Sequence, residues 1–155
     1  MTTYKLFRMR GGKLYPLFVE PDRELPMGEW LEAHVGELVD ETHVRSRLGP
    51  LSRRPGFHST EVPFTDWIGK KQDGKLVQRK ETVWCECEVR GNQLFVKARN
   101  GLRTIPEGWY YFCTKTGQPF PWIVSDGIKI NRILPRAEVV DICREHGVRA
   151  QEMEV

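Results

Sequence analysis

Apolar and polar residues alternate over several short stretches of the chain, and this spacing predicts β-strands. Residues 4–9 (YKLFRM) and 13–19 (KLYPLFV) both alternate, and the two glycines at 11 and 12 between them fit a hairpin turn. Pro16 interrupts the second stretch. Because proline has no N–H to donate to a neighbouring strand, this strand should lie at a sheet edge or carry a bulge.

The segment 82–91 (TVWCECEVRG) has the clearest strand pattern in the chain. Valines and cysteines would occupy one face, whereas a tryptophan, two glutamates and an arginine would occupy the other. This is the pattern of a half-buried strand. We expect its hairpin partner in residues 93–101 (QLFVKARNG), and further strands over 108–114 (GWYYFCT) and on both sides of Asp126-Gly127.

Helical patterns are scarce before the C-terminal part of the chain. Pro135 fits the first position of a helix, an apolar stripe follows it, and Gly147 suits the C-cap. Residues 62–71 fit one or two helical turns, 26–34 a loop, 72–81 a flexible excursion and 151–155 a frayed tail. We therefore expect one α+β domain over residues 1–150, with a mainly antiparallel sheet, few short helices and a C-terminal helix.

Composition places the chain among ordinary globular proteins. It has 155 residues, enough for one domain with a real core, and 39% of them are hydrophobic. No apolar run is long enough to span a membrane, and the N-terminus lacks the basic and apolar regions of a signal peptide. We expect a cytoplasmic protein that does not associate with a membrane.

The four cysteines show neither Cys-x-x-Cys spacing nor an accompanying His-x-x-x-His, which argues against a zinc site. Buried, reduced thiols are the interpretation we favour. On the opposite face of the same segment, Glu86 and Glu88 either share a site with a raised pKa or face water opposite basic side chains. We favour the second alternative.

Basic residues gather in the middle of the chain. Between residues 43 and 80 there are nine Lys or Arg and only three Asp or Glu. Such a segment favours an anionic partner, for which a nucleotide, a nucleic acid or a phosphate would serve. The alternative is a solvated basic loop without a partner.

The stretch 53–60 (RRPGFHST) combines several groups that could carry chemistry. Pro-Gly forces a turn, so His58 and Thr60 should share one face of the strand that follows. Histidine changes its charge near neutral pH, a hydroxyl at Thr60 could support it, and Arg53 or Arg54 could hold a phosphate. The alternative is a histidine with a purely structural hydrogen bond.

Two further groups of residues have both a functional and a structural interpretation. The tryptophans, Trp84 among them, could stack on a base or a nicotinamide ring, although most aromatic residues belong to cores. Arg8 in the first strand either points into a cleft or faces solvent. We favour the structural interpretation for most of these side chains.

The sequence resembles a family of small uncharacterised proteins from bacteriophages and conjugative elements of gut bacteria. The resemblance covers nearly the whole chain and rests on YKLFRMRGGKLYPLFV, PMGEWLEA, RSRLGPLSRRPGFHS, VWCECEV and IKINRIL. It implies a mobile-element context and names no activity.

A looser resemblance is to the ADP-ribosyltransferase fold. It rests on the order of KLFR, GFHST, VWCECEV and the C-terminal PWIVSDGIKINRIL. This resemblance implies a split sheet and a module that handles NAD or ADP-ribose, and it leaves open whether the module is active. The glutamate expected before the late strand is absent from QPFPWIV.

That resemblance also implies residue roles. His58 and Thr60 would be catalytic, and the cofactor would be bound by Arg8, Arg54, Ser59 and Trp84, with an aromatic side chain on the nicotinamide ring and an arginine on the pyrophosphate. The alternative function is a binding module without catalysis, which contacts nucleic acid or a host protein through the basic segment 43–80.

Overall fold

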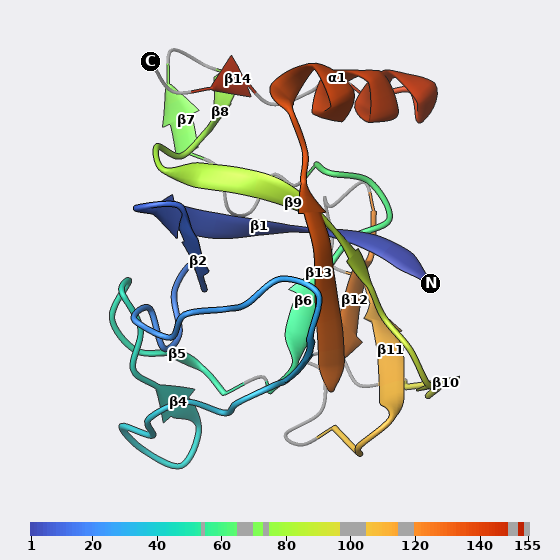
Figure 1. Ribbon diagram of the computed structural model, residues 1–155. Coiled ribbons are helices and arrows are strands. Elements are labelled where there is room, and N and C mark those ends of the chain that lie inside the picture. Colours follow the sequence, from blue (N-terminus) through green and yellow to red (C-terminus); the bar gives the residue numbers. More distant parts are fainter. Residues whose placement is uncertain are drawn as a thin grey trace.

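The structure is a computed structural model of the chain. It describes residues 1–53, 55–64, 70–72, 75–96, 105–114, 120–148 and 152–153. The regular elements of the described chain are mainly antiparallel β-strands, which form two main sheets with one helix across them (Figure 1).

The larger sheet has five antiparallel strands, with the N-terminal strand near its centre. Its order is β2 (Lys13–Tyr15), β1 (Thr2–Arg10), β9 (Thr82–Glu88), β13 (Gly127–Ile133) and β3 (Trp30–Glu32). The predicted hairpin at the N-terminus is confirmed, and β2 ends before Pro16 at the sheet edge. The prediction of a loop over residues 26–34 is wrong at Trp30–Glu32, because these residues form β3, which pairs with β13.

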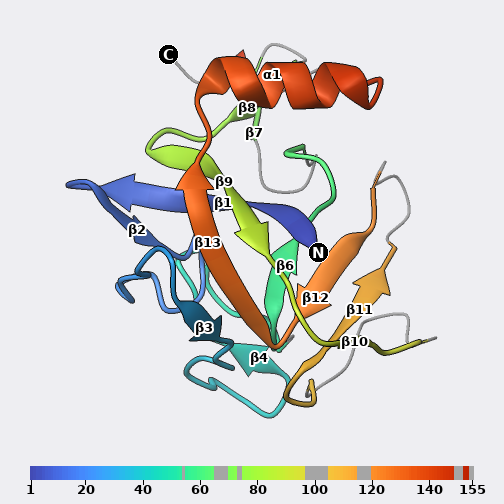
Figure 2. The ribbon, with the colours of Figure 1, turned by 45° about the vertical axis from the view of Figure 1, so that its right-hand side comes forward.

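The second sheet has four strands and contains Phe57–Ser59 of the RRPGFHST stretch. Its order is β10 (Asn92–Gln93), β11 (Trp109–Cys113), β12 (Trp122–Ser125) and β6 (Phe57–Ser59). The strands expected on both sides of Asp126-Gly127 are confirmed, and the chain changes from one sheet to the other between them (Figure 2). The expected hairpin partner of β9 is wrong, because β10 pairs with β11 and β9 lies between β1 and β13.

Two small sheets complete the strands. One consists of β4 (His43–Val44) and β5 (Leu51–Ser52), and the other of β7 (Lys70–Gln72), β8 (Lys75–Gln78) and β14 (Glu152–Met153). The β7–β8 hairpin replaces the excursion expected over 72–81 and the end of the helical turns expected over 62–71. Residues 65–69 of those turns lie outside the described residues. Two residues of the expected tail form β14, which pairs with β8.

The C-terminal helix is confirmed as α1 (Arg136–Glu145). Pro135 is the N-cap rather than the first helical residue, since its backbone is extended and its carbonyl accepts from the N–H of Val139. Gly147 follows the C-cap with a φ of 71°, and the Val148 N–H bonds to the Cys143 carbonyl. These bonds satisfy the last carbonyls of the helix.

The central strands β1 and β9 carry buried side chains on both faces. On one face Phe7, Cys85 and Cys87 join the core between the two sheets, and on the other Leu6 and Trp84 pack beneath Val139 and Cys143 of α1. The half-buried strand expected over 82–91 is therefore wrong at Trp84, which is only 2% exposed. Helix α1 covers the part of this face that carries Trp84, whereas Glu86 and Glu88 on the same face stay partly exposed.

The fold class is mainly β, so the expected α+β class fits only loosely. Within the described residues α1 is the single α-helix. None of the helices in the described part of the chain has the length and apolar character needed to cross a membrane. The ADP-ribosyltransferase-like arrangement of the sheets stays a prediction.

Candidate functional site

The outer edge of β1 is interrupted, and this interruption positions the candidate site. Near its start β1 bonds to Thr60, with N–H to carbonyl distances of 2.7 and 2.8 Å between Tyr4 and Thr60, and from Arg8 onward it pairs with β2. Bonded residues alternate in an antiparallel pair, so the N–H and C=O of Leu6 face this edge between the two partners. A cavity lies beside them.

This cavity, which we call the apolar cavity, has a volume of about 480 Å³. Strand β1, the segment after β2 and the stretch that contains β6 form its walls. The larger apolar side chains of the lining include Leu6, Phe7, Leu17, Phe57, Trp84 and Trp122. Polar lining residues include Lys5, Glu20, Arg23, His34 and His58. An aromatic-walled cavity with a few polar groups is typical of a small-molecule site.

Lys5 contributes the amine of this cavity. Its Nζ donates to the main-chain carbonyl of His58 at 2.8 Å and lies 5.7 Å from the centre of the Phe7 ring. Burial against apolar neighbours lowers the pKa of Lys5 to about 8, because the charged form loses water. Lys5 is in no ion pair among the described residues.

His58 is half-buried on β6 and lines the same cavity. Its ring stands edge-on to Trp122, with the ring centres 5.8 Å apart and the planes at 82°. Strand β6 pairs with β12, which places His58 opposite Val124. The structure thus brings His58, Trp84 and Trp122 to one cavity.

A second cavity, the cationic cavity, has a volume of about 310 Å³. It is lined by the basic residues Arg8, Arg47, Arg79 and Lys80, and Glu81 is the one acidic residue of its described lining. Leu17, Phe18 and Leu48 line both cavities. The two cavities are therefore neighbours that share one apolar wall.

Arg8 is the buried member of the cationic cavity, with 6% of its surface exposed. It donates to the carbonyl of Pro21 at 3.2 Å and lies over the Tyr15 ring at 5.9 Å. Burial, followed by the positive charges of Arg47 and Arg10, holds the pKa of the Arg8 guanidinium below its usual range. An anion in this cavity would relieve that repulsion.

Ser59 and Thr60, two other predicted site residues, are absent from the linings of both cavities. Ser59 and Thr60 are fully buried, and their hydroxyls donate to the carbonyls of Ile123 and Val62. Arg54 lies outside the described residues. The structure therefore brings His58 together with Trp84, places Arg8 in the neighbouring cavity and leaves the two hydroxyls in structural bonds.

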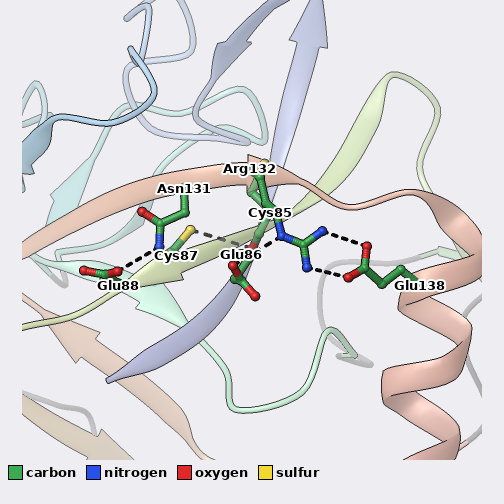
Figure 3. A network of polar contacts seen from close by, with 7 residues as sticks. All are labelled: Cys85, Glu86, Cys87, Glu88, Asn131, Arg132 and Glu138. Carbon is green, nitrogen blue, oxygen red and sulfur yellow. Dashed lines mark hydrogen bonds and ion pairs between the residues drawn. The ribbon is translucent and has the colours of Figure 1, made fainter.

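The polar face of β9 forms a separate surface network (Figure 3). Arg132 on β13 bonds to Glu86 at 3.4 Å and holds Glu138 of α1 with both of its terminal nitrogens. Glu88 accepts from Asn131 at 3.0 Å, and its bonds to Asn131 and Lys129 hold the pKa of its carboxyl below the usual range. The preferred interpretation of the glutamates is confirmed: they lie opposite basic side chains.

The expectation of buried, reduced thiols is confirmed for three of the four cysteines. All four are free; Cys85, Cys87 and Cys143 are buried and Cys113 is half-buried. Burial raises the pKa of Cys85 to about 12 and that of Cys143 to about 11. The described residues contain no group of His, Cys, Asp and Glu that could hold a metal ion.

Lys5 and Arg47 belong to the cavities but were not singled out from the sequence. Lys5 shares a strand face with Phe7, and a lysine on the apolar face of a strand was the available signal. That signal was weak because alternation does not show that both faces of β1 are covered. Arg47 was only one member of the basic segment, and its place beside Arg8 depends on tertiary structure.

The resemblances to mobile-element proteins and to ADP-ribosyltransferases stay predictions. None of the protein-family models, curated proteins or solved structures with which the chain was compared matches it.

Proposed function

We propose that the protein binds a nucleotide-type ligand, with a flat ring in the apolar cavity and phosphate groups in the cationic cavity. The observation that carries this proposal is the shared wall of Leu17, Phe18 and Leu48, which makes an aromatic-lined cavity and a basic cavity neighbours. Aromatic side chains favour flat rings, and arginines hold phosphate oxygens through paired hydrogen bonds.

NAD and ADP-ribose are the ligands we propose first, because each joins a flat adenine ring to a pyrophosphate, and NAD carries a second flat ring. The proposal is one of binding, since the hydroxyls of Ser59 and Thr60 already donate to main-chain carbonyls. His58 remains the proposed side chain for contact with the ring, from its position on the lining.

The test is a titration of the purified protein with NAD, ADP-ribose and ATP. Binding is measured from the change in melting temperature and by calorimetry. We expect a ligand-dependent rise in melting temperature, because a ligand that binds only the folded state stabilises it. Arg47→Gln should weaken binding by about 10-fold or more, the usual effect of losing a charged hydrogen bond.

Arg45→Gln is the matched control. Arg45 lies two residues away, pairs with Glu37 at 3.6 Å and lines neither cavity. Its removal changes the net charge by the same amount, so equal losses of affinity in both variants would contradict the cationic cavity as the phosphate site. No stabilisation by millimolar concentrations of any of the three ligands would contradict the proposal itself.

The same titration with a short DNA duplex tests the alternative of nucleic-acid binding through the segment 43–80. Duplex binding would fall steeply with salt, and both arginine variants would weaken it. Stabilisation by the duplex without stabilisation by nucleotides would favour that alternative.

A further inference from the structure

We propose that Lys5 is a carbonyl-reactive amine, which forms a reversible imine with an aromatic aldehyde or ketone held in the apolar cavity. The inference concerns the same cavity as the proposed nucleotide site but goes beyond binding. It does not need the cationic cavity, because the reacting group is a neutral carbonyl.

The position of Lys5 is the first support. Its side chain leaves β1 on the face of Phe7 and lines the apolar cavity together with His58 and Trp122. The hydrogen bond of Nζ to the His58 carbonyl, at 2.8 Å, holds the amine at this wall. A carbonyl compound whose apolar body fills the cavity would therefore meet the amine.

The charges around Lys5 are the second support. The titratable groups that face Lys5 include the thiols of Cys85 and Cys87 on β9, and the described cavity lining adds His58, Glu20, Arg23 and His34. Glu20, the carboxylate of that lining, is engaged by His34 at 2.8 Å and by Arg23 at 3.9 Å.

No carboxylate of the described residues pairs with Lys5, so burial favours the neutral amine, and the pKa of Lys5 falls to about 8. A neutral amine is the nucleophilic form, which is why lysines in apolar sites form Schiff bases. An ordinary surface lysine stays almost fully protonated at neutral pH.

The step needs no oxidant, reductant or metal. The Nζ lone pair attacks the carbonyl carbon, a C–N bond forms, and the carbonyl oxygen takes up a proton while nitrogen loses one. The resulting hydroxyl takes up a second proton and leaves as water, while the nitrogen lone pair closes the C=N bond and nitrogen gives up its remaining proton. The net reaction joins the amine to the carbonyl compound and releases one water.

The experiment uses benzaldehyde as a neutral probe and cyanoborohydride to reduce any imine to a stable amine. Peptide mapping of the full-length protein then gives the rate of labelling at each lysine. We expect Lys5 to be labelled at least about 10-fold faster than Lys13 near neutral pH, since Lys13 is exposed and paired with Glu24. The rate at Lys5 should fall as the pH drops below 8.

Three controls make the result specific. Lys5→Arg keeps the charge and should lose the fast site, whereas Lys13→Arg should keep it. In urea the preference for Lys5 should disappear, because unfolding removes the cavity. The wild-type map gives the answer even if Lys5→Arg fails to fold.

Labelling of Lys5 no faster than Lys13 in the folded protein would overturn the proposal. Preference that persists in urea would do the same, since it would reflect local sequence rather than the cavity. The labelling experiment can be interpreted even if the nucleotide proposal fails, because benzaldehyde carries no phosphate. If both proposals hold, ADP-ribose should slow the labelling of Lys5.

Discussion

Lys5 couples the stability of the protein to pH through one partly buried amine. Its charged form is disfavoured by burial in the folded state, whereas in the unfolded chain it has the ordinary pKa of 10.5. Between pH 8 and 10.5 the unfolded state binds more protons than the folded state. The free energy of unfolding due to this group must therefore rise with pH across that window.

Lys5→Met should remove this dependence. Methionine keeps the length of the side chain without the charge, so the variant should be about as stable as wild type, or more stable, near pH 7. As the pH rises to 10.5, the free energy of unfolding of the wild type should increase relative to that of the variant by up to about 2 kcal/mol, after allowance for the partial exposure of the amine.

Urea unfolding of both proteins at pH 7, 8.5 and 10 measures that difference. The buried thiols act in the opposite direction, since their raised pKa values cost stability as the pH rises above about 9. They are present in both proteins, so they cancel in the comparison. A difference between the two proteins that does not change with pH would refute the assignment.

Gly91 is a position where the residue type decides the local backbone structure. Its φ is 103°, and a Cβ added there would lie 1.9 Å from the carbonyl oxygen of Gly108. The Asn92 N–H bonds to that same oxygen at 2.9 Å, so the two chain segments approach closely where β10 begins. Only glycine permits this approach.

Gly91→Ala should therefore destabilise the protein far more than Gly11→Ala. Gly11 also has a positive φ, of 56°, but a Cβ there meets nothing within 4 Å. We expect about 1 kcal/mol of lost stability at Gly11 from backbone strain, and about 2 kcal/mol more at Gly91 from the clash. Thermal unfolding of the two variants tests this, and equal losses would show that the contact with Gly108 relaxes freely.

At the scale of elements, α1 is held by its buried face rather than by its caps. Its N-cap is Pro135, which offers no side-chain hydrogen bond. Val139 and Cys143 are almost fully buried against Leu6 and Trp84. The helix and the central strands therefore stabilise each other through this contact.

Val139→Ala should lower the free energy of unfolding by about 1–3 kcal/mol, because buried methyl groups are lost and a cavity remains. Asp141→Ala on the exposed face is the control and should change stability by no more than about 0.5 kcal/mol. Chemical denaturation measures both. A comparable loss for the two variants would contradict packing of the buried face as the main source of stability at α1, because alanine has a higher helix propensity than either residue it replaces.

Strand prediction succeeded where local pattern decides the outcome. The hairpin at Gly11-Gly12, the strand at 82–88 and the C-terminal helix follow from turn residues, alternation and a 3.6-residue stripe. Strand pairing was not local: β9 pairs with β1 and β13 instead of the segment that follows it. The assumption that neighbouring segments form hairpins failed there, because β9 lies between the N-terminal strand β1 and the late strand β13.

At the scale of the whole molecule, the sequence predicted some residues of the candidate site, whereas folding decided which of them lie together. His58 and Trp84 were predicted, and the structure brings them to one cavity. Thr60 and Ser59 follow His58 on the strand, but both are buried where β6 meets β1 and β12, and their hydroxyls bond to main-chain carbonyls. Composition showed that residues 43–80 form a basic segment. Only the fold places Arg47 of that segment in the same cavity as Arg8.

Local sequence was enough to predict the strand-rich character, the hairpin turn and the C-terminal helix, because each depends on neighbours a few residues apart. Tertiary structure alone decided which strands pair, which faces are covered and which polar groups share a cavity. Those features join residues such as Lys5 and His58, which are 53 positions apart. Periodicity carries no information about such pairs, since many pairings bury the same apolar residues equally well.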